Sequence, residues 1–258
     1  MTTADSRREE IADYVIAHGQ VRIDKLVEHF GVSRMTIHRH IDQLAAKGVL
    51  RKLHGAVTAQ PSGIYESLHR YRATVATTEK QALAKAALAH IEPGQVIFLD
   101  DSTTAGAIAP FLNEIDPLTV ISNSVAVANA LVDADVVDFI CLGGQYHRTY
   151  NAYIDHICLR AIEALRADLL ICSASAIEGT TAFIQDQQVA RVKQTMVASA
   201  SKSILLADHT KFGKVALNVF GDLTDFDTVI VTDSLDPGEI ERLRKAGVNL
   251  QIVKGASR

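Results

Sequence analysis

The sequence predicts an α/β protein made of two parts, a small helical domain followed by a larger domain built on a mostly parallel sheet. In residues 1–60, apolar side chains recur at helical spacing. From residue 77 onward, near-continuous apolar runs alternate with helical stretches, a pattern typical of parallel strands covered on both faces. We therefore expect a first domain over residues 1–60, a linker over 61–76 and an α/β domain over 77–258.

The first domain is predicted to begin with a helix over residues 6–17. Ser6 is a suitable N-cap, and Glu9 three residues later would complete a capping box. One face of this helix is marked by the i, i+3, i+4, i+7 spacing of Ile11, Tyr14, Val15 and His18.

Two more helices and a hairpin complete this domain. The second helix is predicted over residues 23–30 and the third over 33–47, with a glycine turn between them. Ser33 would cap the third helix and Gly48 would end it. Residues 49–58 are predicted to form a small β-hairpin.

The larger domain shows seven apolar runs and six helical stretches in alternation. The strands are predicted over residues 96–99, 119–121, 137–142, 169–172, 204–206, 229–231 and 250–253. The helices are predicted over residues 78–90, 104–114, 124–132, 155–166, 186–200 and 237–246. Thr78 and Gln81 would form a capping box at the start of the first of these helices.

Composition places the chain among cytoplasmic globular proteins. Of its 258 residues, 48% are apolar and 22% are charged, as in ordinary folded domains. No run approaches the roughly 18 apolar residues that a membrane span needs. The polar start lacks the apolar core of a signal peptide, so we expect no secretion. Three widely spaced cysteines (Cys141, Cys158 and Cys172) form neither a disulfide framework nor a metal motif, which fits a reducing compartment.

The net charge of −4 hides a difference between the two domains. Residues 1–60 hold nine Lys and Arg against seven Asp and Glu, whereas the rest of the chain holds 17 against 23. Five of the ten histidines also lie in the first domain. A slightly basic first domain is compatible with a nucleic-acid partner, although so small a surplus proves nothing by itself.

The third helix has the geometry of a DNA-recognition helix. Ile37, Ile41 and Leu44 fall on one side of it and should face the core. Met35 and Arg39 then point away from the core, and Thr36 and His38 lie on the flanks. These outward residues include donors suited to phosphates and base edges. A packing module whose basic residues are merely solvated is the alternative.

The candidate DNA contacts come from this helix and from the hairpin, which would form a basic wing. Arg34 lies in the first turn of the helix, where a backbone phosphate would pass. The full set is Ser33, Arg34, Met35, Thr36, His38, Arg39, Arg51, Lys52 and His54.

The first domain resembles the winged helix-turn-helix of the DeoR family of bacterial transcriptional regulators. The resemblance rests on Arg7-Arg8, Gly19-x-Val21, Leu26-Val27, Phe30-Gly31-Val32-Ser33-x-x-Thr36-Ile37, Gly48-x-Leu50-x-Lys52 and His54-Gly55-Ala56. The family usually has arginine and aspartate where this chain has His38 and His40, and one more wing glycine. The resemblance implies DNA binding. The two histidines suggest an altered operator preference and an affinity that strengthens as the pH falls through the histidine range.

Polar residues follow four of the predicted strands. They are Asp100-Asp101-Ser102-Thr103-Thr104, Ser122-Asn123-Ser124, Gly143-Gly144-Gln145 and Asp208-His209-Thr210-Lys211. Ligands of parallel α/β sheets bind at the carboxyl ends of the strands. Hydroxyls and amides at the start of a helix suit a phosphate, lysines can add charge, and carboxylates can accept hydrogen bonds from sugar hydroxyls. Ordinary helix capping would explain each loop taken alone.

The larger domain resembles the C-terminal domain of the DeoR family. The similar segments are Phe98-Leu99-Asp100-x-x-Thr103-Thr104, Thr119-Val120-Ile121-Ser122-Asn123-Ser124, Leu142-Gly143-Gly144, Lys193, Leu206-Ala207-Asp208-His209-x-Lys211-Phe212-Gly213 and Thr232-Asp233. The resemblance implies a fold like that of sugar-phosphate isomerases and a phosphorylated sugar or related metabolite as effector.

The candidate effector contacts follow from the strand ends and from this resemblance. They are Asp100, Asp101, Ser102, Thr103, Thr104, Ser122, Asn123, Ser124, Gly143, Gly144, Arg148, Lys193, Asp208 and Lys211. Ser102 stands where the family usually has glycine, and the acidic residue often found shortly before the lysine is missing ahead of Lys193. Arg148 would meet a second anionic group or remain a surface arginine.

The function expected from these observations is repression of a carbohydrate-catabolism operon under the control of a phosphorylated sugar. We expect double-stranded operator DNA and a second copy of the chain as partners, in a dimer or tetramer, because paired half-sites need paired readers. We expect no catalytic residue, no cofactor, no metal and no membrane. The alternative is an isomerase or deaminase with an accessory DNA-binding domain, for which Asp100, Asp101, Asp208 and His209 are the candidate proton-transfer groups.

Overall fold

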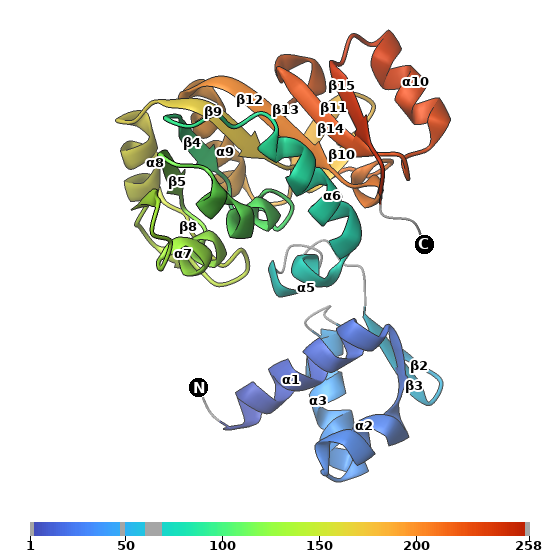
Figure 1. The fold of residues 1–258 in the computed structure, drawn as a ribbon. Coiled ribbons are helices and arrows are strands. Elements are labelled where there is room, and N and C mark those ends of the chain that lie inside the picture. Colours follow the sequence, from blue (N-terminus) through green and yellow to red (C-terminus); the bar gives the residue numbers. More distant parts are fainter. Residues whose placement is uncertain (1–2, 47–49, 60–68, 256–258) are drawn as a thin grey trace. The chain divides into compact units, whose positions relative to one another are not determined.

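The computed structural model describes residues 3–46, 50–59 and 69–255 and divides the chain into two compact units (Figure 1). The units are Met1–Val75 and Ala76–Arg258. The N-terminal unit has one hydrophobic core, and the C-terminal unit has one on each face of its sheet.

The N-terminal unit packs helices against a three-stranded antiparallel sheet. Its elements are α1 (Thr3–His18), β1 (Gln20–Arg22), α2 (Ile23–Phe30), α3 (Arg34–Ala46), β2 (Leu50–Leu53), β3 (Ala56–Ala59) and α5 (His69–Thr74). The strand order is β1-β3-β2, so the predicted hairpin gains a third strand from the short link after α1. The core is built from Ile11, Val15, Leu26, Ile37, Ile41, Leu44, Leu50 and Val57.

The predicted helix ends in this unit are partly correct. Ser33 caps α3 as expected, because its Oγ accepts the Thr36 amide at 3.2 Å. Gly31 takes the left-handed conformation (φ 61°) and ends α2. The N-cap assigned to Ser6 is wrong, because α1 already begins at Thr3 and Ser6 lies inside it. Gly48 lies outside the described residues.

The C-terminal unit is built on a seven-stranded sheet in which every pair of neighbours is parallel, as the sequence predicts. The strand order is β15-β14-β12-β9-β4-β5-β6. The strands are β4 (Val96–Leu99), β5 (Leu118–Ser122), β6 (Val137–Cys141), β9 (Ala167–Cys172), β12 (Ala200–Ala207), β14 (Thr228–Thr232) and β15 (Leu250–Val253). The chain reverses its direction of travel across the sheet between β4 and β9, where ligands of such sheets bind.

Helices cover both faces of this sheet (Figure 1). On one face lie α6 (Thr77–Leu88), the 3₁₀ helix η1 (Ala105–Glu114) and α7 (Val125–Leu131). On the other lie α8 (His156–Glu163), α9 (Gln187–Ala198) and α10 (Pro237–Lys245). Successive residues of β4 face opposite layers, since Ile97 and Leu99 join the first core and Phe98 joins the second.

Several short elements are absent from the sequence prediction. A three-stranded antiparallel sheet has the order β10-β11-β13, and a two-stranded one pairs β7 with β8. Their bounds are β7 (Tyr146–His147), β8 (Ala152–Tyr153), β10 (Ala176–Glu178), β11 (Thr181–Ile184) and β13 (Asn218–Asp222). Two 3₁₀ turns, η2 (His209–Lys211) and η3 (Leu223–Asp225), flank β13. None of these strands shows the continuous apolar run by which the parallel strands were recognised.

The start of α6 also differs from the prediction. Its N-cap is Ala76, which makes no side-chain cap hydrogen bond, so the capping box assigned to Thr78 and Gln81 is wrong. Ala76 has φ 51°, a left-handed conformation that costs a non-glycine residue on the order of 1–2 kcal/mol. A residue in an unfavourable conformation therefore stands at the boundary between the two units.

Two composition-based expectations can be compared with the described residues. Among them, no helix has the length and apolar character that crossing a membrane requires. All three cysteines are free thiols, with Cys141 exposed and both Cys158 and Cys172 buried. Burial raises the pKa of Cys158 to about 12, so this thiol stays protonated.

Candidate DNA interface and effector site

The predicted recognition helix, α3, presents its residues as the helical spacing predicts. Ile37, Ile41 and Leu44 are buried, whereas Met35 is 82% exposed and Arg39 is exposed. Thr36 and His38 are half-buried on its flanks, while Ser33, Arg34, Arg51, Lys52 and His54 are exposed at its start and on the hairpin. All nine predicted DNA contacts therefore reach the surface of the N-terminal unit.

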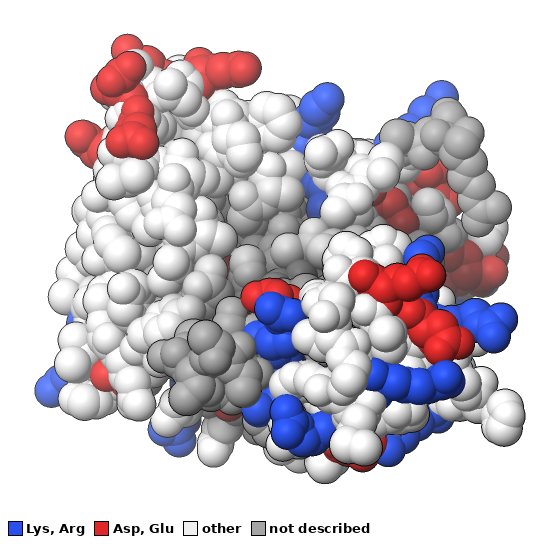
Figure 2. Space-filling view, turned by 90° about the horizontal axis from the view of Figure 1, so that it is seen from below, with Lys and Arg blue, Asp and Glu red and all other residues white. Residues whose placement is uncertain are grey.

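Two of these basic residues, Arg34 and Lys52, form ion pairs with acidic neighbours. Arg34 lies 3.1 Å from Asp24 of α2, and Lys52 of β2 forms an ion pair with Asp42 of α3. Exposed ion pairs of this kind contribute on the order of 0–1 kcal/mol, so a DNA phosphate could compete for either cation. Figure 2 shows basic side chains interspersed with acidic ones on the face that it displays. Binding would therefore depend on a few placed contacts.

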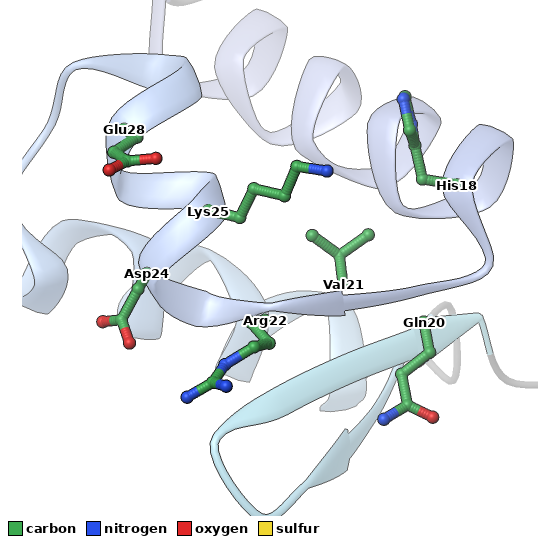
Figure 3. Close-up of a pocket in the computed structure, with 7 residues that line it drawn as sticks. All are labelled: His18, Gln20, Val21, Arg22, Asp24, Lys25 and Glu28. Carbon is green, nitrogen blue, oxygen red and sulfur yellow. The ribbon is translucent and has the colours of Figure 1, made fainter.

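A pocket of about 380 Å³ lies beside this surface, between the end of α1, β1 and α2 (Figure 3). It is lined by His18, Gln20, Val21, Arg22, Asp24, Lys25 and Glu28. None of the predicted DNA contacts lines it. The two basic residues are matched by two acidic ones, so the pocket has no strong preference for an anion.

His40 occupies a place that the sequence prediction did not foresee. It is only 3% exposed and lies on α3 among Ile37, Ile41 and Leu44. Within the described part of the chain its Nδ1 is buried and has no hydrogen-bond partner. Burial lowers the pKa of His40, and the charges of Arg39, Arg8 and Arg7 lower it further.

These facts correct the expected pH dependence of DNA binding. His40 faces the core, so it cannot contact DNA, and its lowered pKa keeps it neutral where an ordinary histidine begins to charge. The spacing could have shown this, because residue 40 lies at i+3 from residue 37 and four before residue 44, on the apolar face of the helix. Only His38 remains as a histidine of this helix that could meet DNA.

In the C-terminal unit, a buried ion pair organises the carboxyl edge of the sheet. Asp100, which follows β4, is fully buried, and its Oδ2 accepts hydrogen bonds from Lys193 Nζ and from the Ser173 amide at 3.0 Å. Its Oδ1 accepts the Ser102 amide at 2.9 Å and the Ser102 hydroxyl at 2.5 Å. Lys193 also lies 3.3 Å from Asp101 Oδ1. The pair therefore joins the ends of β4 and β9 to α9.

Lys193 stays charged in this buried position. Burial by itself would lower the pKa of Lys193, but Asp100 and Asp101 outweigh that effect and raise the pKa above its usual value. The Lys193 ammonium also donates to the Ser173 carbonyl at 3.3 Å. Two buried carboxylates thus surround the Lys193 ammonium.

Ser102, which stands where the DeoR family usually has glycine, forms hydrogen bonds within the turn after β4. Its hydroxyl donates to Asp100 and accepts the Ala105 amide at 3.0 Å, and the residue is only 6% exposed. The hydroxyl therefore shapes the turn into η1. Thr104 is buried and Thr103 is half-buried at the start of η1.

The polar residues after β5 serve partly as caps. Ser124 Oγ accepts the Val127 amide at 3.4 Å at the start of α7, and Ser122 Oγ accepts the Ser124 amide at 3.1 Å. Asn123 Nδ2 donates to the Tyr153 carbonyl at 3.0 Å. Among the described residues, the buried Asn123 Oδ1 has no hydrogen-bond partner.

Asp208 supplies a second buried acceptor with spare capacity. Its Oδ1 accepts the amide and hydroxyl of Thr210, whereas no described residue donates to its buried Oδ2. Lys211 follows in η2 and is half-buried. Buried acceptors without donors are costly, so a hydroxyl-bearing ligand would relieve the cost at both Asp208 and Asn123.

The glycines after β6 have a structural reason of their own. Gly144 has φ 138°, and a Cβ there would collide with the Asp155 carboxylate. Asp155 caps α8 through the amides of Ile157 and Cys158 at 2.9 and 3.0 Å. Gly143 and Arg148 are exposed, and Arg148 lies in the turn between β7 and β8.

Two residues at the start of α6 belong to this edge and were missed by the sequence prediction. Lys80 is 3% exposed and donates to Thr103 Oγ1 at 3.0 Å. Glu79 Oε1 lies 2.5 Å from His209 Nδ1, and its Oε2 accepts the Thr232 hydroxyl. The first turn of α6 is thus bonded to residues at the ends of β4, β12 and β14. In the sequence the two residues are an ordinary charged pair in a first helical turn.

Metal binding finds no support in the described ranges, where no group of three His, Cys, Asp or Glu side chains is arranged to hold an ion. His38 and His40 diverge, one half-buried at the surface and the other in the core.

We predict that Lys193→Met lowers the free energy of unfolding of the C-terminal unit by about 3–5 kcal/mol, because it leaves two buried carboxylates without their cation. Asp100→Asn combined with Lys193→Met should recover part of the loss. Chemical unfolding followed by circular dichroism measures both. The exposed Lys202→Met is the control, and a single variant as stable as its control would contradict the role given to the pair.

We also predict that the N-terminal unit loses stability as the pH falls below about 6.5, the ordinary histidine value. The folded pKa of His40 is lowered, so its contribution is fully present above that pH and is lost as the unfolded chain takes up a proton. Amide hydrogen exchange in α3 between pH 5 and 7.5 measures the effect. His40→Asn should flatten the profile, and equal slopes in the two proteins would refute the assignment.

Known families match both units. Residues 7–62 match the DeoR-like helix-turn-helix domain, and residues 75–234 match the DeoR C terminal sensor domain. The uncharacterized HTH-type transcriptional regulator YgbI of Escherichia coli (strain K12) is 30% identical over 96% of this chain and 97% of its own length. The glycerol-3-phosphate regulon repressor of the same strain is 30% identical over 90% of this chain and 91% of its own.

Among solved structures, a D-ribose-5-phosphate isomerase in complex with phospho-erythronic acid has a TM-score of 0.39 and 17% identity, with 52% of each chain covered. The two family matches together cover most of the chain, and both relatives align with it over at least nine-tenths of their length. The chain belongs to the DeoR family of DNA-binding transcriptional regulators.

Proposed function

We propose that the chain represses an operon for carbohydrate use and that a phosphorylated sugar bound at the carboxyl edge of its sheet changes its affinity for the operator. The observation that carries this proposal is the combination, in one DeoR-family chain, of an outward-facing recognition helix and a polar strand edge built on Asp100 and Lys193. The glycerol-3-phosphate regulon repressor is a relative with a phosphorylated compound in its name.

The N-terminal unit would read DNA through α3 and the hairpin. Arg39 and Met35 project from the face of α3 opposite its core, the face that enters a major groove in helix-turn-helix proteins. His38, beside Arg39, can form single hydrogen bonds but lacks the two-pronged donor of the usual arginine. This replacement supports an operator preference of its own.

The C-terminal unit offers two chemistries to an effector. Buried acceptors of Asp208 and Asn123 suit the hydroxyls of a sugar. Thr103 and Thr104, at the start of η1, together with the ammonium groups of Lys80 and Lys211, suit a phosphate. A polyhydroxy phosphate satisfies both sets, whereas a plain sugar or inorganic phosphate satisfies one.

We propose that the unit senses its ligand without converting it. Both oxygens of Asp100 are occupied by hydrogen bonds, so this carboxylate is poorly placed to move a proton. Conversion of triose, pentose or hexose phosphates by the purified protein would overturn this part of the proposal. As an operator-binding regulator, the protein would act in the cytoplasm.

We predict that Arg39→Ala weakens binding to the DNA upstream of its own operon by about 5-fold or more, since a well-placed arginine contact contributes on the order of 1–3 kcal/mol. Fluorescence anisotropy with labelled upstream fragments measures the change. Arg160→Ala, an exposed arginine of α8, is the matched control. Equal operator affinity in the two variants would remove α3 from the interface.

We predict the opposite result for Lys211→Ala. This variant should keep operator binding in the absence of ligand and lose most of the thermal stabilisation that a phosphorylated sugar gives the wild type. Thermal shift with triose, pentose and hexose phosphates, each beside its unphosphorylated form, tests this. Wild-type stabilisation that survives in Lys211→Ala would place the phosphate elsewhere.

A further inference from the structure

Arg22, the last residue of β1, is poorly suited to the place that it occupies in the chain. It is the N-cap of α2, with φ −71° and ψ 143°, the extended backbone that an N-cap adopts. The side chain of an N-cap normally accepts a free amide of the first turn, but Arg22 forms no such hydrogen bond. Its positive charge also lies at the positive end of the helix dipole. A residue that weakens the helix it begins points to a function elsewhere.

Arg22 stands between the two elements that carry the predicted DNA contacts. The amide of the next residue, Ile23, donates to the Gly55 carbonyl in the turn of the hairpin at 3.1 Å. Asp24, one residue further, lies 3.1 Å from Arg34, the first residue of α3. The immediate neighbours of Arg22 thus bond to the hairpin on one side and to the predicted recognition helix on the other.

The side chain of Arg22 projects outward at this place. It leaves β1 on the side opposite Val21 and Lys25 (Figure 3). Val21 is buried, whereas Arg22 is exposed. In the sheet Arg22 pairs with Ala56, which in turn pairs with Leu53, so the arginine lies in the row next to the hairpin turn. Its guanidinium therefore reaches solvent beside that turn.

The charges close to Arg22 on α2 leave a positive surplus. Asp24 is the nearest acidic residue in the sequence and forms an ion pair with Arg34, so these three residues together carry one net positive charge. Lys25 and Glu28 follow on the same helix and cancel each other. Among the residues that the structure describes, none forms a hydrogen bond or an ion pair with the Arg22 guanidinium.

The sheet that contains Arg22 adds no acidic residue. Arg22, Arg51 and Lys52 are the charged residues of its three strands. Lys52 is paired with Asp42 of α3, and Arg51 is exposed. The carboxylates of Asp24 and Asp42 therefore each have a cation of their own, and the Arg22 guanidinium remains available to an anionic partner.

We propose that Arg22 binds a phosphate of the operator backbone, between the contacts of the hairpin and those of α3. This inference rests on the DNA binding of the proposed function. A guanidinium presents paired donors that match the oxygens of a phosphate. Contacts to phosphates orient a protein on the duplex and carry no sequence information. Arg22 therefore adds affinity for the operator and for unrelated DNA alike, at the expense of the stability of α2.

Arg22→Ser in the full chain separates this role from a structural one, because it should change helix stability and DNA binding in opposite directions. Serine supplies the missing cap and removes the cation, so amide hydrogen exchange in α2 should slow by about 5-fold. Fluorescence anisotropy at several salt concentrations measures DNA binding. Upstream DNA and an unrelated duplex of equal length should both bind about 5-fold more weakly. The slope of log affinity against log salt concentration should fall by about one.

The matched control is Lys25→Gln, which removes the same charge three residues away, on the other side of β1. It should leave the affinity and the salt slope nearly unchanged. Arg22→Lys keeps the charge and should keep the slope. An unchanged slope in Arg22→Ser, a loss confined to the upstream DNA, faster exchange in α2, or an equal loss in Lys25→Gln would each overturn the proposal.

The same measurements separate a failure of this contact from a failure of the proposed function. A wild type that binds its upstream DNA independently of Arg22 would overturn the phosphate contact alone. A wild type that depends on Arg22 but keeps the same DNA affinity with every phosphorylated sugar would count against the proposed function and leave the contact standing.

Discussion

The buried contact between Asp100 and Lys193 is the constraint around which the C-terminal unit is arranged. It connects the ends of β4 and β9, the strands between which the chain changes its direction across the sheet. It also joins both strands to α9, one of the helices that cover the sheet. A buried charge is tolerated only where partners surround it, so the Ser102 turn, the Ser173 amide and Asp101 are all fixed by this one requirement. The same requirement makes the edge polar at the place where a ligand would arrive.

The parallel sheet could be predicted because its strands are buried on both faces and leave long apolar runs in the sequence. The small antiparallel sheet could not, since β10, β11 and β13 mix apolar residues with polar residues or glycine and leave no continuous apolar run. The contribution of Glu79 and Lys80 to the carboxyl edge of the sheet could not be predicted for another reason. Their partners His209 and Thr103 lie 130 and 23 residues away, and only the fold brings them together.

His40 shows how a family substitution can be misread from sequence alone. A residue of the predicted recognition helix is easily assumed to contact DNA, yet the helical periodicity places position 40 on the buried side of the helix. An imidazole there fills core volume beside the arginines of α1, where an aspartate would supply a countercharge. The substitution therefore bears on the stability of the reader, while His38 bears on what the reader recognises.

The first turn of α6 connects the proposed effector site to the residue at which the C-terminal unit begins. Lys80 holds Thr103, Glu79 holds His209 and Thr232, and the residue that opens the helix, Ala76, is the first of its unit. Any ligand that competes for these hydroxyl and imidazole groups acts on the point where the chain enters the sensor. If an effector binds as proposed, it would therefore act on the very turn with which the C-terminal unit begins, and no relay through its sheet would be needed to reach that turn.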